Sequence, residues 1–223
     1  MNPTATRKRV AVLISGRGSN MQALVEAAAA PGFPAKIATV ISNRPDAAGL
    51  LWAADQGIAT VALDHKAHPD RAAFDAKLHE TLKAADIDLV ALAGFMRILT
   101  PGFVASWQGR MINIHPSLLP LFPGLDTHAR AIEAGVKIAG CTAHFVTAEM
   151  DVGPIIVQAA VPVGSDDTPA TLADRVLAAE HRIYPQALEW VAGDRVTFET
   201  VGTACYGSAG LDTRLISPAA TGG

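Results

Sequence analysis

Apolar runs that alternate with helical segments constrain the fold of this 223-residue chain more than any other feature. The run at residues 10–14 (VAVLI) holds no polar residue, as expected for a strand covered on both faces. The alternation predicts an α/β fold with a doubly wound, mostly parallel sheet, and two consecutive strands near 139–163 predict a mixed C-terminal edge. Further strands are expected at residues 36–41, 59–63, 89–93, 111–116, 139–146, 154–163 and 196–201, and helices at 21–30, 45–56, 70–85, 101–107, 127–134 and 169–192, the last with Thr168 as N-cap.

Composition indicates one domain with a full core. Half of the residues are hydrophobic and only 17% are charged. Because no repeat and no linker-like change of composition interrupts the chain, we expect a single domain at residues 1–207. Residues 208–223 are rich in small and polar types, so we expect a poorly ordered tail.

Charge and cysteine content exclude several classes of protein. The net charge of −3 leaves no electrostatic footprint for nucleic acid or an anionic membrane. Cys141 and Cys205 lie far apart without a CxxC pair, which argues against a disulfide framework or a thiolate zinc site. No run of residues has the length of a signal peptide or a membrane span, so we expect a cytoplasmic chain.

The stretch MINIHPSLLP places two polar side chains in a strand of the core. Asn113 and His115 are two positions apart, so on a strand both point to the same face. An amide and an imidazole aimed together at the end of a buried strand indicate a site. A core histidine beside a turn asparagine is the alternative at this stage.

The loop after the first strand, Ser15-Gly16-Arg17-Gly18-Ser19-Asn20, favours a phosphate. Its free backbone N–H groups would lie at the N-terminus of the first helix. Met21 occupies the place of the third glycine of a dinucleotide motif, and the Lys-Ser/Thr pair of a P-loop is missing. A mononucleotide-like or sugar phosphate fits best. The alternative is a ligand-free turn with Ser19 or Asn20 as N-cap.

Other chemistry-bearing residues are harder to interpret. Asp151 precedes a Gly-Pro pair, and near His115 it would orient the imidazole or hold its proton. Glu180 by itself is most simply an exposed helical glutamate. His128 and His144 lack any metal-binding spacing with His115, so no metal is expected. Surface positions are expected for His65, His68 and His79, and an apolar wall near the first loop for residues 95–99.

Three segments together resemble the phosphoribosylglycinamide formyltransferases. They are SGRGSNMQAL, AGFMRIL with INIHPSLLPLFPGLDTH, and HFVTAEMDVGPII, and the similarity runs from about residue 9 to about residue 201. The resemblance implies a Rossmann-like fold and a reaction of purine biosynthesis. In it, the amine of glycinamide ribonucleotide attacks the formyl carbon on N10 of 10-formyltetrahydrofolate, without a metal.

The resemblance also implies roles for individual residues. Asn113 and His115 would stabilise the developing oxyanion, and Asp151 would pair with His115 and help to move the proton. The remaining contacts fall into two sets. The substrate phosphate would be held by Gly18, Ser19 and Asn20, its ribose hydroxyls by Glu180, and the folate by Leu92, Met96, Arg97, Leu99, Val104, Val146, Thr147 and the loop through Asp151.

Two departures and three rival functions accompany this resemblance. Asp126 stands where some members have histidine, and Val152 where some have glycine. A formyltetrahydrofolate hydrolase is expected to carry an extra N-terminal domain, and a methionyl-tRNA formyltransferase a C-terminal RNA-binding extension. A phosphosugar-binding module would have no use for Asn113, His115 and Asp151 together. The oligomeric state stays open between monomer and homodimer.

Overall fold

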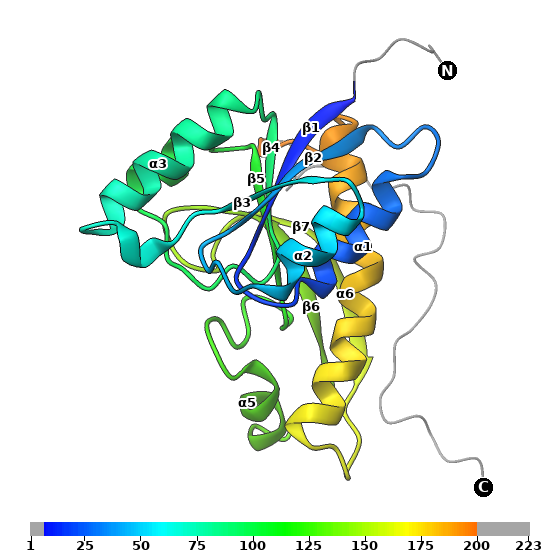
Figure 1. Ribbon diagram of the computed structural model, residues 1–223. Coiled ribbons are helices and arrows are strands. Elements are labelled where there is room, and N and C mark those ends of the chain that lie inside the picture. Colours follow the sequence, from blue (N-terminus) through cyan, green and yellow to red (C-terminus); the bar gives the residue numbers. More distant parts are fainter. Residues whose placement is uncertain (1–6, 200–223) are drawn as a thin grey trace, which may run out of the picture.

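A seven-stranded mixed sheet forms the centre of the molecule in the computed structural model, which describes residues 7–199 (Figure 1). The strand order is β3-β2-β1-β4-β5-β6-β7. Strands β1 to β5 pair in parallel, whereas β6 pairs antiparallel with both β5 and β7. The α/β fold with a mixed C-terminal edge is therefore confirmed.

The elements follow the predicted order, and most boundaries differ by only a few residues. The strands are β1 (Lys8–Ile14), β2 (Ala35–Ser42), β3 (Ala59–Ala62), β4 (Leu89–Leu92), β5 (Met111–His115), β6 (Ile138–Phe145) and β7 (Ile155–Pro162). The helices are α1 (Ser19–Ala28), α2 (Ala48–Asp55), α3 (Arg71–Ala84), α4 (Pro101–Ser106), α5 (Thr127–Glu133) and α6 (Pro169–Ala192), with a short 3-10 helix η1 (His65–Ala67).

Helices cover both faces of the sheet and create two apolar clusters. Val10, Val12 and Ile14 of β1 belong to the cluster that includes α1, α2 and α6. Ala11 and Leu13, which point the other way, belong to the cluster that includes α3 and α4. Figure 1 shows α3 on one side of the sheet and α1, α2 and α6 on the other. A strand covered in this way is apolar at every position, which explains the uninterrupted run at residues 10–14.

Helix α6 packs in the same layer as α1 and α2 and is hydrogen-bonded to strands β4 and β5. Thr168 caps it as predicted, since its side chain accepts a hydrogen bond from the N–H of Thr171. The fully buried Tyr184 hydroxyl lies 2.8 Å from the Leu92 carbonyl oxygen and 3.2 Å from that of Ile112. One phenol thus fixes the helix against both β4 and β5.

The predicted strand at residues 196–201 is wrong over residues 196–199, which form turns. Val196 and Phe198 alternate with polar residues as in a strand, but their side chains close the end of the core. Val196 is buried, and the Phe198 ring meets the Phe145 ring edge-on at 5.7 Å between centroids. Residues 200–201, the expected domain boundary at 207 and the expected tail at 208–223 lie outside the described residues.

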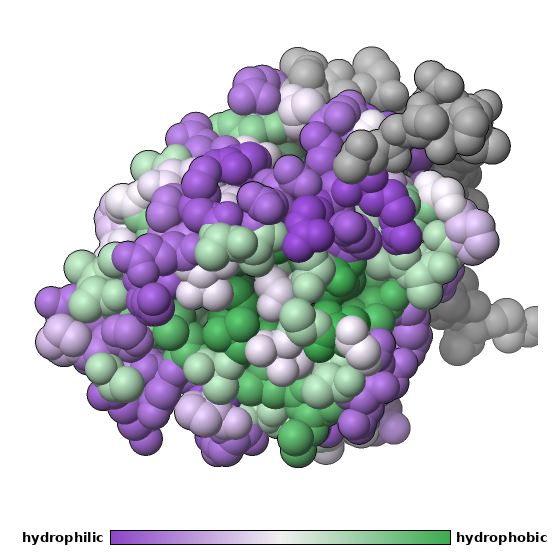
Figure 2. Space-filling view, turned by 45° about the horizontal axis from the view of Figure 1, so that its top comes forward, coloured by the Kyte–Doolittle hydropathy of each residue, from purple (hydrophilic) through white to green (hydrophobic). Residues whose placement is uncertain are grey.

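Apolar residues also reach the surface. Figure 2 shows them gathered in one area of the visible face, bordered by hydrophilic residues. Half of the chain is hydrophobic, so complete burial is not expected. Within residues 7–199, no helix combines the length and the apolar character needed to cross a membrane.

Candidate active site

Strand β5 presents its two polar side chains to one face, as predicted. Ile112 and Ile114 point into the cluster beneath α1 and α6, so Asn113 and His115 face the opposite side. Across the antiparallel ladder, Asn113 lies opposite His144 and His115 opposite Thr142. The register of β5 and β6 therefore brings an amide and two imidazoles into one cluster.

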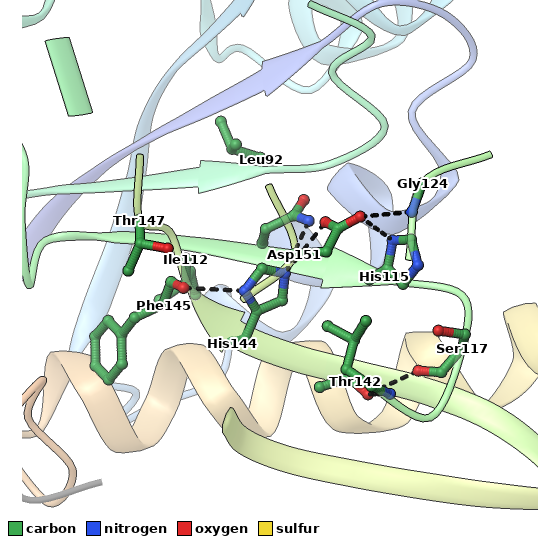
Figure 3. Close-up of polar contacts among 12 residues, drawn as sticks. Leu92, Ile112, His115, Ser117, Gly124, Thr142, His144, Phe145, Thr147 and Asp151 are labelled. Carbon is green, nitrogen blue, oxygen red and sulfur yellow. Dashed lines mark hydrogen bonds and ion pairs between the residues drawn. The ribbon is translucent and has the colours of Figure 1, made fainter. Parts of the chain in front are cut away.

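Asp151 joins this cluster from the loop between β6 and β7 (Figure 3). Its Oδ2 lies 3.5 Å from His115 Nδ1 and its Oδ1 lies 3.9 Å from His144 Nε2. Oδ2 also accepts a hydrogen bond from the N–H of Gly124 at 2.8 Å. The contact with His115 is an ion-pair distance, longer than the usual N–H···O bond.

Gly153 allows the Asp151 loop to lie against β6. The residue is buried, and a Cβ at this position would overlap the carbonyl oxygen of Phe145. The N–H of Phe145 donates to the Pro154 carbonyl oxygen at 2.9 Å, which holds the loop at its far end. The Gly-Pro pair thus fixes the chain beside Asp151, which itself has a φ of 58°.

Hydrogen bonds determine the tautomer of His144. Its Nδ1 lies 2.9 Å from the Phe145 carbonyl oxygen, which can only accept, so Nδ1 carries the proton. Burial lowers the pKa of His144 and favours the neutral ring. Its Nε2 then accepts a hydrogen bond from the Asn113 amide nitrogen at 3.2 Å. His144 therefore turns the NH₂ group of Asn113 toward itself and leaves the second N–H of that group for another acceptor.

His115 is enclosed between oxygen acceptors. The residue is only 6% exposed, and its Nε2 lies 3.1 Å from the Phe122 carbonyl oxygen while Nδ1 faces Asp151. The loop that supplies Phe122 is held by β6, because the Thr142 hydroxyl donates to the Ser117 carbonyl oxygen at 2.7 Å. An imidazolium at this position can donate to both neighbours.

The glycine-rich loop enters α1 without a side-chain cap. Gly18 is the N-cap residue, with a φ of 74° and no side-chain cap. The alternative, in which Ser19 or Asn20 caps the helix, does not hold, because both residues lie inside α1. The glycine at this position adopts a left-handed conformation that other residues rarely adopt, and no side-chain cap bond is made to the first N–H groups of the helix.

Glu180 is buried, contrary to the simplest expectation from its sequence. It is 5% exposed, and its Oε2 accepts a hydrogen bond from the Asn20 amide at 2.6 Å. Burial raises the pKa of Glu180, and the bond from Asn20 opposes that change. Helical spacing contained the missed signal, since Val176, Ile183 and Tyr184 lie at the i−4, i+3 and i+4 positions and are all buried.

The expected folate residues fall into two groups. Leu92, Leu99 and Val104 share the apolar cluster beneath α3 and α4, and Val146 packs against it. The side chains of the other members make different contacts. Met96 is 72% exposed, and the Thr147 hydroxyl donates to the Glu149 carbonyl oxygen. The Arg97 guanidinium lies 4.5 Å from the centroid of the Phe74 ring, which belongs to the cluster.

His65, His68 and His79 are half-buried rather than on the surface, and His79 contacts the rings of Phe103 and Trp107. Burial, with a smaller effect of His115, lowers the pKa of His128. Among residues 7–199, no group of three or more His, Cys, Asp or Glu side chains is placed to hold a metal. Asp126 is the N-cap residue of α5 but makes no side-chain cap bond, and Val152 is 60% exposed.

Comparison with known proteins decides the family. The family model described as "Formyl transferase" matches residues 8–188. This chain belongs to the formyl transferase family. This formyl transferase is 46% identical over 187 residues to the phosphoribosylglycinamide formyltransferase of Escherichia coli (strain K12), which covers 84% of this chain and 88% of the relative.

This formyl transferase is also similar to part of a longer protein and to solved structures. It is 50% identical over 200 residues to the trifunctional purine biosynthetic protein adenosine-3 of Homo sapiens, which covers 90% of this chain and 20% of the relative. The chain thus spans about a fifth of the length of that relative. The structure of glycinamide ribonucleotide transformylase 1 from Symbiobacterium toebii has a TM-score of 0.83 at 50% identity, covering 85% of this chain and 89% of that one.

Proposed function

We propose that this formyl transferase moves the formyl group of 10-formyltetrahydrofolate to the amine of glycinamide ribonucleotide. The products are formylglycinamide ribonucleotide and tetrahydrofolate, and the reaction belongs to de novo purine biosynthesis in the cytoplasm. The observation that carries this proposal is the cluster of Asn113, His115 and Asp151 on the β5–β6 face. The relatives named phosphoribosylglycinamide formyltransferase support it.

The cluster supplies groups for each step of formyl transfer. The amine nitrogen attacks the formyl carbon, a C–N bond forms, and the carbonyl electron pair moves to oxygen. The free N–H of Asn113 donates to this oxyanion, and His115 donates to it when one of its ring nitrogens leaves its present neighbour, Asp151 or the Phe122 carbonyl oxygen. One preorganised donor of this kind is worth about 3 kcal/mol. Asp151 receives the proton of the attacking amine. When the intermediate collapses, the bond to N10 breaks and N10 takes up a proton, so that no net proton is consumed.

The two substrates would bind to separate parts of the molecule, one at the start of α1 and the other at the apolar cluster under α3 and α4. The N–H groups of Gly18, Ser19 and Asn20 bind the phosphate at the positive end of α1. Glu180, held by Asn20, accepts hydrogen bonds from the ribose hydroxyls. The folate ring packs on Leu92, Leu99, Val104 and Val146, and backbone groups of Met96, Arg97 and Thr147 read its polar edge. No metal is needed, because the folate nitrogen already activates the formyl group.

The experiment that tests this function measures consumption of 10-formyltetrahydrofolate with and without glycinamide ribonucleotide. We expect consumption only with the amine, together with one formylated product for each folate released. Consumption that is independent of the amine would support a hydrolase instead. Binding of the ribonucleotide without any formyl transfer would support a phosphosugar-binding module.

A further inference from the structure

Two buried side chains hold the ends of the segment at residues 96–100, here called the folate segment. It connects β4 to α4 and contains Met96, Arg97 and Leu99 of the proposed folate site. At its start, the N–H of Met96 donates to the Ser15 hydroxyl at 2.8 Å. At its end, the N–H of Thr100 donates to Asp75 Oδ2 at 2.6 Å. Both acceptors come from elements far away in the sequence.

Asp75 has no evident reason to be buried for stability. It lies on α3 and is 2% exposed, and within the described residues its Oδ1 has no hydrogen-bond partner. A carboxylate that leaves water for one backbone bond, with its second oxygen unpaired, destabilises the fold, so its presence points to a role other than stability. Holding Thr100 in position is such a role.

Thr100 controls the second half of the folate subsite. Its hydroxyl caps α4 by accepting from the N–H of Phe103 at 3.3 Å, and α4 carries Val104. The neighbour of Asp75 on α3, Phe74, receives the guanidinium of Arg97 on its ring. Helix α3 therefore fixes both the end of the folate segment and the start of α4.

Ser15 links the folate segment to the glycine-rich loop. It is the last residue before Gly16 and is buried; its hydroxyl donates to Asn43 Oδ1 at 2.6 Å while accepting from Met96. Its own N–H donates to the Gly94 carbonyl oxygen at 3.2 Å. Removing this hydroxyl takes the partner from one donor, the Met96 N–H, and from one acceptor, Asn43 Oδ1.

We propose that Asp75 and Ser15 are positioning residues: Asp75 sets the folate subsite alone, and Ser15 sets the folate and phosphate subsites together. The inference rests on the proposed function. Neither residue touches a reacting atom, so the expected signature is a change in KM rather than in kcat. A purely structural role would lower the active fraction, which changes the observed kcat and leaves both KM values as they are.

The test compares variants by steady-state kinetics with each substrate varied in turn. For Asp75→Ala, we expect the KM for 10-formyltetrahydrofolate to rise about tenfold, with kcat and the KM for glycinamide ribonucleotide within about twofold of the wild type. Asp75→Asn restores most of the folate KM, because its carbonyl oxygen can still accept from Thr100. For Ser15→Ala, both KM values rise.

Thr39→Val is the control, because Thr39 is also buried and its side chain also bonds the backbone, but it does so by donating to the Ala59 carbonyl oxygen between β2 and β3. Unchanged folate KM in Asp75→Ala, or equal rises for both substrates, would overturn the role of Asp75. Should Asp75→Ala fail to fold, Ser15→Ala decides, and unchanged KM values there refute the link. If the wild type transfers no formyl group, the proposed function fails separately. Calorimetric titration with tetrahydrofolate then still tests whether Asp75→Ala weakens folate binding about tenfold.

Discussion

The proton on His144 decides how the Asn113 amide is turned. Because His144 Nδ1 donates to the Phe145 carbonyl oxygen, Nε2 can only accept, and it accepts from Asn113. A protonated His144 would repel that NH₂ group and reverse the amide. The lowered pKa of His144, which burial causes, therefore keeps Asn113 a donor across the neutral pH range.

Loss of His115 or Asp151 should stop turnover without unfolding the protein. We expect His115→Ala and Asp151→Ala each to lower kcat by roughly 10²–10⁴-fold, the range for one positioned acid–base group. Steady-state assays with glycinamide ribonucleotide measure the effect, and far-UV circular dichroism checks the fold. His68→Ala, outside the cluster, serves as control. Full activity in either site variant would refute the mechanism.

Glu180 should make stability depend on pH. Its pKa is raised in the folded state, so its contribution to stability is complete below the unfolded value of 4.5 and is lost as pH rises through the folded value. Glu180→Gln keeps an acceptor for Asn20 without the charge. We expect this variant to match the wild-type melting temperature near pH 4 and to exceed it near pH 7.5, by about 1 kcal/mol of unfolding free energy.

The control for this experiment is Glu189→Gln, a half-exposed glutamate on the same helix. Its melting temperature should differ from that of the wild type by the same amount at both pH values. A pH-independent difference for Glu180→Gln as well would contradict the linkage. In either case, loss of the carboxylate should weaken binding of glycinamide ribonucleotide, since stability and substrate contact oppose each other at this residue.

At the scale of elements, the junction of β1 and α1 should control one substrate only. Gly18 has a φ of 74°, and a Cβ there would lie 2.9 Å from the Met21 methyl carbon. A β-branched residue at this φ is strained, so Gly18→Val should distort the phosphate loop. Wild-type protein at about 100 Kd of either substrate should gain roughly 5–10 °C in melting temperature. We expect Gly18→Val to lose the gain from glycinamide ribonucleotide and to keep that from tetrahydrofolate.

Gly32→Val is the control, because it places the same side chain at another glycine with a positive φ. Gly32 has a φ of 83° with no atom near its Cβ position, and it lies beyond the opposite end of α1. It should lower stability to a similar extent while both ligand responses persist. Equal loss of the two responses in Gly18→Val would argue against a phosphate site in this loop.

Local patterns predicted the elements better than the contacts between them. Period-two alternation was sufficient to put Asn113 and His115 on one face, because strand geometry forces it. It could not reveal His144 as the partner of Asn113, since that depends on the register of β6. Apolar and polar residues alternate at residues 196–199 as they would in a strand. Only the three-dimensional structure shows that Val196 and Phe198 pack against the end of the core instead.

For the whole molecule, the site is assembled from segments that meet at one side of the sheet. The loop after β1, the folate segment after β4, the end of β5 and the loop after β6 contribute in turn, and Ser15 and Asp151 connect them through hydrogen bonds and close ion pairs. Distances of this kind follow from tertiary packing, which is why the sequence suggested the residues but not Ser15, Asp75 or the burial of Glu180.

The hydrogen bond between Asn20 and Glu180 joins residues that are 160 positions apart in the sequence. On the ribosome, the glycine-rich loop and α1 are therefore made long before the carboxylate that holds Asn20. Because domains fold as units once their partners are available, a nascent chain with α6 still in the exit tunnel presents the loop without its acceptor. The glycine-rich loop acquires its final geometry only when α6 has emerged and packed against α1.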